Sequence, residues 1–170
     1  MVFFGRRRRR ERLLRAFEQA YDEHDLVAAR DSLNSLRELG DDGPEVRLFS
    51  ALLASHESPA EGGLGELERL AEQDSENPAV HLFLGEALLE RAAYARASQA
   101  LQRSLALDKH NARALCGLGV AHARQGRINL AQDYFLRTAV YDRDLILTRL
   151  LALCEANLAE QQRAREKISP

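Results

Sequence analysis

The sequence predicts an all-α protein built from a repeated pair of helices, an α-solenoid. The chain is rich in Ala, Leu, Glu and Arg and contains only 4 Pro and 10 Gly, a composition that favours helices. Its apolar and small residues return with a period of 34 residues. Capping residues stand where this period starts new helices, so two independent signals agree on the boundaries.

The repeat is clearest between Leu84-Gly85 and Leu118-Gly119, which lie 34 residues apart. Extending the period backward gives four helix-turn-helix units at 10–43, 44–77, 78–111 and 112–145. Small residues recur at one position in all four units and at a second in three, which lets paired helices approach closely. These residues are Ala29, Gly63, Ala97 and Ala131, and then Ala51, Gly85 and Gly119.

The units differ in regularity. The first unit has Phe17 where later units have a small residue, and the second replaces the tight turn by the longer segment 57–63. The third unit opens with Asn77-Pro78, an N-cap followed by a proline at the first helical position. Asn111 is placed to cap the helix that starts the fourth unit.

Two segments flank the repeats. Residues 1–9 form a basic and aromatic N-terminal extension. Residues 146–170 form a tail in which apolar and polar residues continue one helical pattern as far as Lys167. Such a helix is expected to cap the solenoid, because the last repeat otherwise leaves its core open.

The 34-residue period, the Leu-Gly pair of the first helix and the small residue of the second resemble the tetratricopeptide repeat family. The repeats are degenerate: the resemblance is strong in the last two units, fair in the first and weak in the second. It implies a right-handed α-solenoid that binds proteins without catalysis, in a concave groove lined by the first helix of each repeat. The groove residues carried over are Leu14, Leu48, Phe49, Leu52, Leu82, Phe83, Glu86, Leu89, Cys116 and Val120.

A groove of this composition is largely apolar and predicts a hydrophobic or amphipathic segment of a partner protein. The alternative is that some of these residues pack between neighbouring helices, because a phase error of one residue exchanges the two faces. The leading hypothesis is an adaptor or assembly subunit. A chaperone for a secreted or assembling protein, and an accessory subunit of an enzyme complex, are alternatives.

The N-terminal extension offers a second contact. Residues 1–15 hold seven arginines against one glutamate, which leaves −8 for the rest of a chain with net charge −2. This tip can meet an anionic membrane, dock into a partner, or be a solvated extension of the first helix. Nucleic acid is disfavoured because the acidic body would oppose a phosphate backbone. The contact residues are Phe3, Phe4, Arg6, Arg7, Arg8, Arg9 and Arg10.

No catalytic residues, metal ligands or cofactor motif are predicted. Cys116 and His122 are six residues apart on one helix, about 240° around its axis, and therefore do not meet. The chain has only 2 cysteines, both in helical stretches, which favours free thiols and the reducing cytoplasm. A membrane contact would make the protein peripheral at the inner face. The preference for Arg over Lys suggests a bacterial gene of high GC content.

Overall fold

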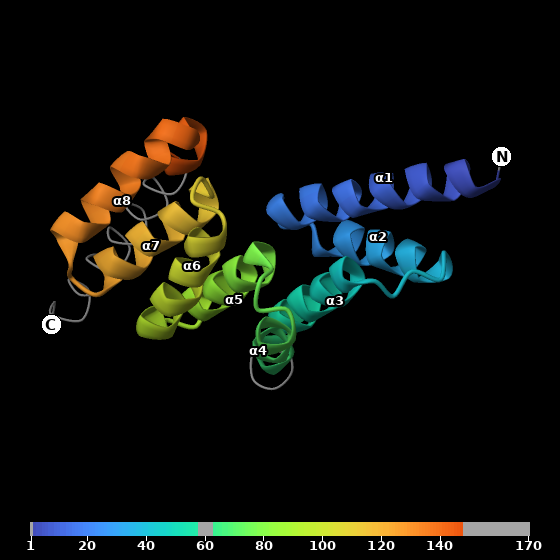
Figure 1. Ribbon diagram of the computed structural model, residues 1–170, viewed down its shortest axis with the longest axis horizontal. Coiled ribbons are helices and arrows are strands. Elements are labelled where there is room, and N and C mark those ends of the chain that lie inside the picture. The colour runs from blue at the N-terminus through green and yellow to red at the C-terminus, as the bar shows by residue number, and fades with distance from the viewer. Residues whose placement is uncertain (1, 58–62, 148–170) are drawn as a thin grey trace, which may run out of the picture. The chain divides into compact units, whose positions relative to one another are not determined.

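The computed structural model describes residues 2–57 and 63–147, with side chains from Gly5 onward. Regular structure in this part is entirely α-helical, as the sequence predicts (Figure 1). The helices are α1 (Val2–Asp22), α2 (Leu26–Glu38), α3 (Pro44–Glu57), α4 (Gly63–Gln73), α5 (Pro78–Glu90), α6 (Tyr94–Leu107), α7 (Ala112–Arg124) and α8 (Ile128–Tyr141).

The helices fall into two compact units that divide between Ser75 and Glu76. In the first unit, α1 packs on α2, α2 on α3 and α3 on α4. In the second unit, α5 packs on α6, α6 on α7 and α7 on α8, and α5 also packs on α7. Each unit is therefore a row of antiparallel helix hairpins, and the predicted α-solenoid class is confirmed.

Local capping explains where the helices begin. α3, α5 and α7 start at Pro44, Pro78 and Ala112, the residues at which the period starts the last three repeats. The side-chain oxygens of Asn77 and Asn111 each accept a backbone N–H bond of 3.0 Å from the first turn of the following helix. Both predicted caps are confirmed, and each satisfies a donor that a helix start otherwise leaves open.

The recurrent small residues lie where paired helices touch. A Cβ on Gly85 would lie 2.5 Å from Cγ of Leu101, and one on Gly119 would collide with the ring of Phe135. Ala97 and Ala131 on the second helices are 0% and 2% exposed. Larger side chains do not fit at these contacts, so the pattern of small residues follows from helix spacing.

An aromatic stack replaces this small-residue contact in the first repeat. Phe17 of α1 is 1% exposed and stacks on Phe49 of α3, with ring centroids 3.9 Å apart. One turn further along α1, the hydroxyl of Tyr21 lies 2.8 Å from Nε2 of His56. These contacts join the first helices of two successive repeats.

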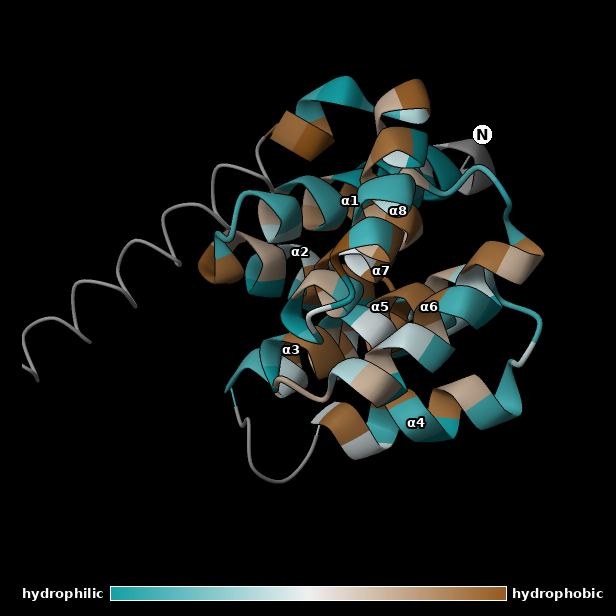
Figure 2. Cartoon of the chain, turned by 90° about the vertical axis from the view of Figure 1, so that its left-hand side faces the viewer, coloured by the Kyte–Doolittle hydropathy of each residue, from teal (hydrophilic) through white to brown (hydrophobic). Residues whose placement is uncertain are grey.

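The core of the second unit is aliphatic. Leu82, Leu101, Ala114 and Leu118 form a buried cluster drawn from α5, α6 and α7. Each fully buried leucine of this kind contributes roughly 1.5–3 kcal/mol. In the first unit, α4 is amphipathic and buries the face that carries Gly63, Leu67 and Leu70. Figure 2 shows apolar and polar bands alternating along this helix.

Both ends of the repeat array continue as helix. α1 runs without a break through residue 10, so the predicted extension 1–9 is the first part of α1 for the residues described. After α8, residues 143–147 are helical, and Oδ1 of Asp142 accepts an N–H bond of 2.8 Å from Leu145. Ile146 is buried there. The rest of the predicted capping helix lies outside the described residues.

Candidate partner-binding face

Five half-buried side chains from the first helices of the third and fourth repeats lie on the side-by-side pair α5 and α7. They are neither core residues nor fully solvated ones. Three are apolar and two are charged. We call this set the α5–α7 face: Phe83, Glu86 and Leu89 from α5, and Arg113 and Val120 from α7.

Arg113 holds the face together. Its Nε and Nη2 donate to Oε1 and Oε2 of Glu86 at 3.1 and 2.8 Å, a two-point pairing of guanidinium and carboxylate. Its Cζ lies 5.2 Å from the ring centroid of Phe83, within the range of a cation–π contact. One α7 side chain therefore fixes the orientation of two α5 side chains.

This ion pair is partly shielded from water. The Arg113 side chain is 33% exposed and that of Glu86 is 18% exposed. Charges at this depth interact more strongly than fully solvated pairs, because less water screens them. The face thus presents a rigid polar centre beside apolar side chains.

A glycine of α7 leaves room for a leucine of α6. A Cβ on Gly117 would lie 2.9 Å from Cδ1 of Leu101, which is too close, and 3.5 Å from Cδ1 of Leu89, which is an ordinary contact distance. Leu89 of α5 therefore lies within contact distance of α7 at this position. Gly117 holds the same repeat position in the fourth repeat as Phe83 does in the third. The position therefore carries an aromatic side chain in one repeat and a helix-packing glycine in the next.

Solved structures resemble the chain over most of its length. The PilF protein of Pseudomonas aeruginosa is 19% identical with a TM-score of 0.65, covering 95% of this chain and 74% of that one. YrrB, described as a TPR protein with an unusual peptide-binding site, is 16% identical with a TM-score of 0.59, covering 81% and 70%. The chain has a tetratricopeptide-like fold.

A MamA structure adds a third match to this tetratricopeptide-like fold, at 17% identity and a TM-score of 0.55, with 79% of this chain and 73% of that chain covered. No family model matches the sequence, and no curated protein matches it. At these identities the likeness shows the fold alone. The missing family match agrees with repeats that are degenerate in sequence.

Half of the predicted groove residues lie within the packed interior of the tetratricopeptide-like fold. For these residues the prediction of a solvent-facing groove is wrong, and they pack between helices instead. A helical position turns by about 100° per residue, so a small error in phase moves a side chain from groove to core. The buried residues are Leu48, Phe49, Leu52, Leu82 and Cys116, each between 1% and 5% exposed.

The other predicted groove residues are half-buried. Leu14 lies on α1 of the first unit, and Phe83, Glu86, Leu89 and Val120 belong to the α5–α7 face. Sequence reasoning missed Arg113. The spacing of the two residues was a usable signal. Arg113 follows Glu86 by 27 residues, which is seven fewer than the 34-residue repeat. Seven residues make about two helical turns, so Arg113 lies on the same side of its helix as the repeat equivalent of Glu86.

Three of the predicted N-terminal contact residues have partners within the first unit. Nε of Arg10 donates to Asp41 at 2.6 Å and its Nη2 to Glu45 at 3.0 Å. Arg6 donates to the backbone oxygen of Leu39 at 2.6 Å, and Arg7 donates to Glu11 at 3.1 Å. Arg6 and Arg10 therefore attach α1 to the α2–α3 turn.

The remaining N-terminal contact residues differ in how far the structure describes them. Phe3 and Phe4 lie in the first turn of α1, with side chains outside the described part. Arg8 and Arg9 are exposed.

His122 is a buried packing residue. It is 3% exposed and stacks on Tyr134 with ring centroids 5.5 Å apart. Neither ring nitrogen has a hydrogen-bond partner among the described residues. Burial, and then the charge of Arg127, lower the pKa of His122, so the ring is neutral at physiological pH.

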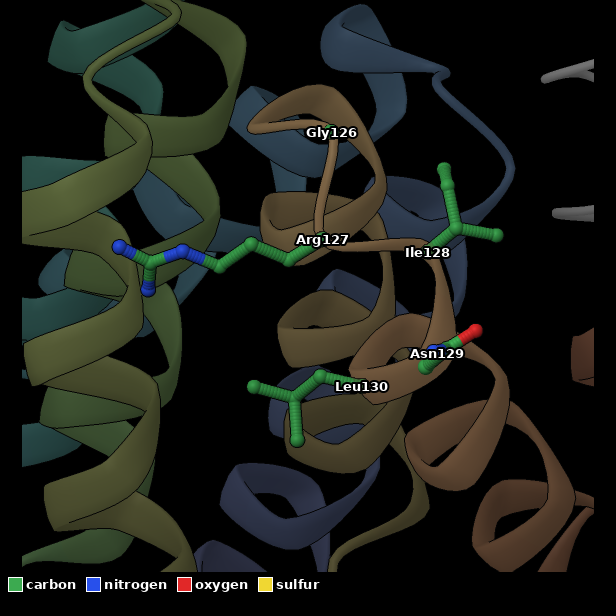
Figure 3. Close-up of a pocket in the computed structure, with 5 residues that line it drawn as sticks. All are labelled: Gly126, Arg127, Ile128, Asn129 and Leu130. Atoms are coloured by element: carbon green, nitrogen blue, oxygen red, sulfur yellow. The ribbon is translucent and has the colours of Figure 1, made fainter.

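An open hollow of about 420 Å³ lies at the turn between α7 and α8. Five consecutive residues, 126–130, line it, and Figure 3 shows Arg127 and Leu130 pointing to one side and Ile128 and Asn129 to the other. This lining contains one charged group and no acid or nucleophile. It therefore supplies no catalytic set.

Across residues 2–57 and 63–147, no group of three or more His, Cys, Asp or Glu side chains is arranged to hold a metal ion. Over the same ranges, every helix is too short or too polar to cross a bilayer.

Proposed function

We propose that the protein is a non-enzymatic adaptor that binds a segment of a partner protein on the α5–α7 face. The observation that carries this proposal is the fixed Arg113–Glu86 pair beside Phe83, Leu89 and Val120. Rigid polar groups next to half-buried apolar side chains suit a segment with apolar anchors and backbone or polar groups between them. Arg113 can donate to such a segment and Glu86 can accept.

The chemistry of the partner follows from these groups. Phe83, Leu89 and Val120 favour two or three apolar side chains, spaced as along a helix or an extended strand. YrrB, a structure of similar fold, has a peptide-binding site, which supports a peptide as occupant. A chaperone or an accessory enzyme subunit would use the same face, and the identity of the partner separates them.

The test selects peptides from a random library on the full chain and measures their Kd by calorimetry. Val120→Glu places a charge on the α5–α7 face and is expected to weaken binding by roughly tenfold or more, the range of an interface anchor. Leu136→Glu is the matched control, since Leu136 lies on α8 and is 72% exposed.

The two variants have opposite expected outcomes. Leu136→Glu should bind the selected peptides as the parent chain does, and both variants should keep the helical circular dichroism of the parent. Equal affinity of Val120→Glu and the parent would contradict the proposal. So would an equal loss in both variants.

A further inference from the structure

Four arginines form an exposed stripe on α1. Arg8, Arg12 and Arg15 follow one another at spacings of four and three residues, which places them on one face of the helix, and Arg9 lies beside them. All four are exposed. The stripe extends over about 10 Å of the helix, at 1.5 Å per residue.

The stripe is separate from the arginines that hold α1 in place. Arg6 and Arg10 contact the α2–α3 turn and Arg7 pairs with Glu11. Within the part of the chain that the structure describes, the four stripe guanidinium groups make no hydrogen bond or ion pair. Folding therefore leaves these four charges available for a ligand outside the chain.

The N-terminal part of α1 extends beyond its hairpin partner. α1 has 21 residues and α2 has 13, and Figure 1 shows the first turns of α1 reaching past the end of α2. A Cβ on Gly5 would meet nothing within 4 Å. The sequence ahead of the stripe, residues 1–4, is entirely apolar. No described neighbour therefore covers this helix at Gly5.

We propose that the arginine stripe of α1 binds the phosphate headgroups of an anionic lipid surface. Guanidinium groups pair with phosphates at two points and remain charged at all physiological pH values. A straight stripe without a hollow suits a flat array of headgroups more than a single shaped ligand. Basic residues beside a short apolar segment are the combination found in helices that lie at membrane interfaces.

The charge distribution favours a membrane over a nucleic acid or an acidic protein chain. The chain beyond residue 15 carries −8, which repels any polyanion that follows the surface away from α1. A membrane presents its phosphates in a plane and does not follow the surface of the protein, and salt at physiological strength screens charges that are more than about 8 Å apart. This contact goes beyond the adaptor function and uses a different surface.

The test is flotation of the full chain with vesicles of phosphatidylcholine, with and without phosphatidylglycerol. The parent chain is expected to float only with the anionic vesicles, and added salt should release it. Changing Arg8, Arg9, Arg12 and Arg15 to Gln should lower the partition coefficient roughly fivefold per residue, and so roughly 600-fold in total.

A matched control removes the same charge elsewhere. Arg47, Arg96, Arg124 and Arg143 are exposed in the structure, and changing all four to Gln should leave flotation close to that of the parent. Should the stripe variant fail to fold by circular dichroism, the double variant Arg8→Gln, Arg12→Gln gives the same test with a smaller loss.

Several results would overturn the proposal. These are binding of the parent to neutral vesicles, an equal loss in the stripe and control variants, and tight binding to poly-glutamate or single-stranded DNA without flotation. Val120→Glu, which tests the adaptor function, should float like the parent chain. The two proposals can therefore fail independently.

Discussion

Residue 92 in the turn of the third repeat is an alanine with a positive φ of 56°. One repeat later the same position is Gly126, with φ 75°. L residues with a side chain are strained in this region, whereas glycine is not. The turn geometry is thus the same in both repeats, and only the fourth repeat has the residue that adopts it without strain.

Ala92→Gly is therefore expected to stabilise the chain by about 0.5–1 kcal/mol, the relief of strain less the added freedom of the unfolded backbone. Gly126→Ala is the reciprocal control and should destabilise by about 1 kcal/mol. Urea unfolding followed by circular dichroism measures both. Stabilisation by Gly126→Ala would show that the turns are not strained as described.

His122 gives a prediction for pH. Its folded-state pKa is lowered, so the unfolded chain binds the proton more tightly, with an ordinary pKa of about 6.5. The stability from this group is complete above about pH 6.5 and declines as the pH falls below that value toward the folded-state pKa. His122→Phe keeps an aromatic ring against Tyr134 and should remove this part of the pH dependence.

The measurement for His122 is the free energy of unfolding of both chains between neutral and mildly acidic pH. The difference between them isolates His122 from the other titrating groups. The free energy of unfolding should fall less with pH in the variant than in the parent. The variant should also be more stable at neutral pH, because two unpaired ring nitrogens are removed. Parallel pH curves would contradict the assignment.

At the scale of elements, Arg113 links α7 to α5. Replacing Arg113 by Ala, Glu86 by Ala, and both together gives a double-mutant cycle. The half-buried two-point pair is expected to show a coupling energy of about 1–2 kcal/mol in urea unfolding. A coupling near zero would mean that the two helices are held by apolar packing alone.

Helix boundaries could be predicted from the sequence because their causes are local. The caps Asn77 and Asn111 act on the turn that follows them, and the period fixes the starts of α5 and α7. The face that each helix buries could not be predicted with the same accuracy. Phe49 and Phe83 hold the same position in successive first helices, 34 residues apart, yet the first is buried and the second half-buried. Which of them is buried depends on partner helices such as α1, whose Phe17 occupies the space beside Phe49.

At the scale of the whole molecule, the sequence predicts four repeats in one unbroken register, whereas the chain divides into two units between Ser75 and Glu76. The register runs through this division, so no feature of the period marks it. The boundary between the two units depends on which helices pack together. The spacing of residues along the sequence gives no information on that. The buried cluster of Leu82, Leu101, Ala114 and Leu118 lies wholly within the second unit, on α5, α6 and α7.

Residues 76–170 are therefore expected to fold without the first unit. Their circular dichroism should be helical, and their unfolding in urea should be cooperative. A fragment that is unstructured, or that unfolds without a transition, would show that the second unit depends on the first.

Hydrogen exchange of the full chain, with and without a selected peptide, tests the adaptor function most directly. The α5–α7 face predicts that the peptide slows amide exchange in α5 and α7 while α6 and α8 exchange as before. Slowed exchange confined to α8 or to the first unit would contradict the proposed binding face.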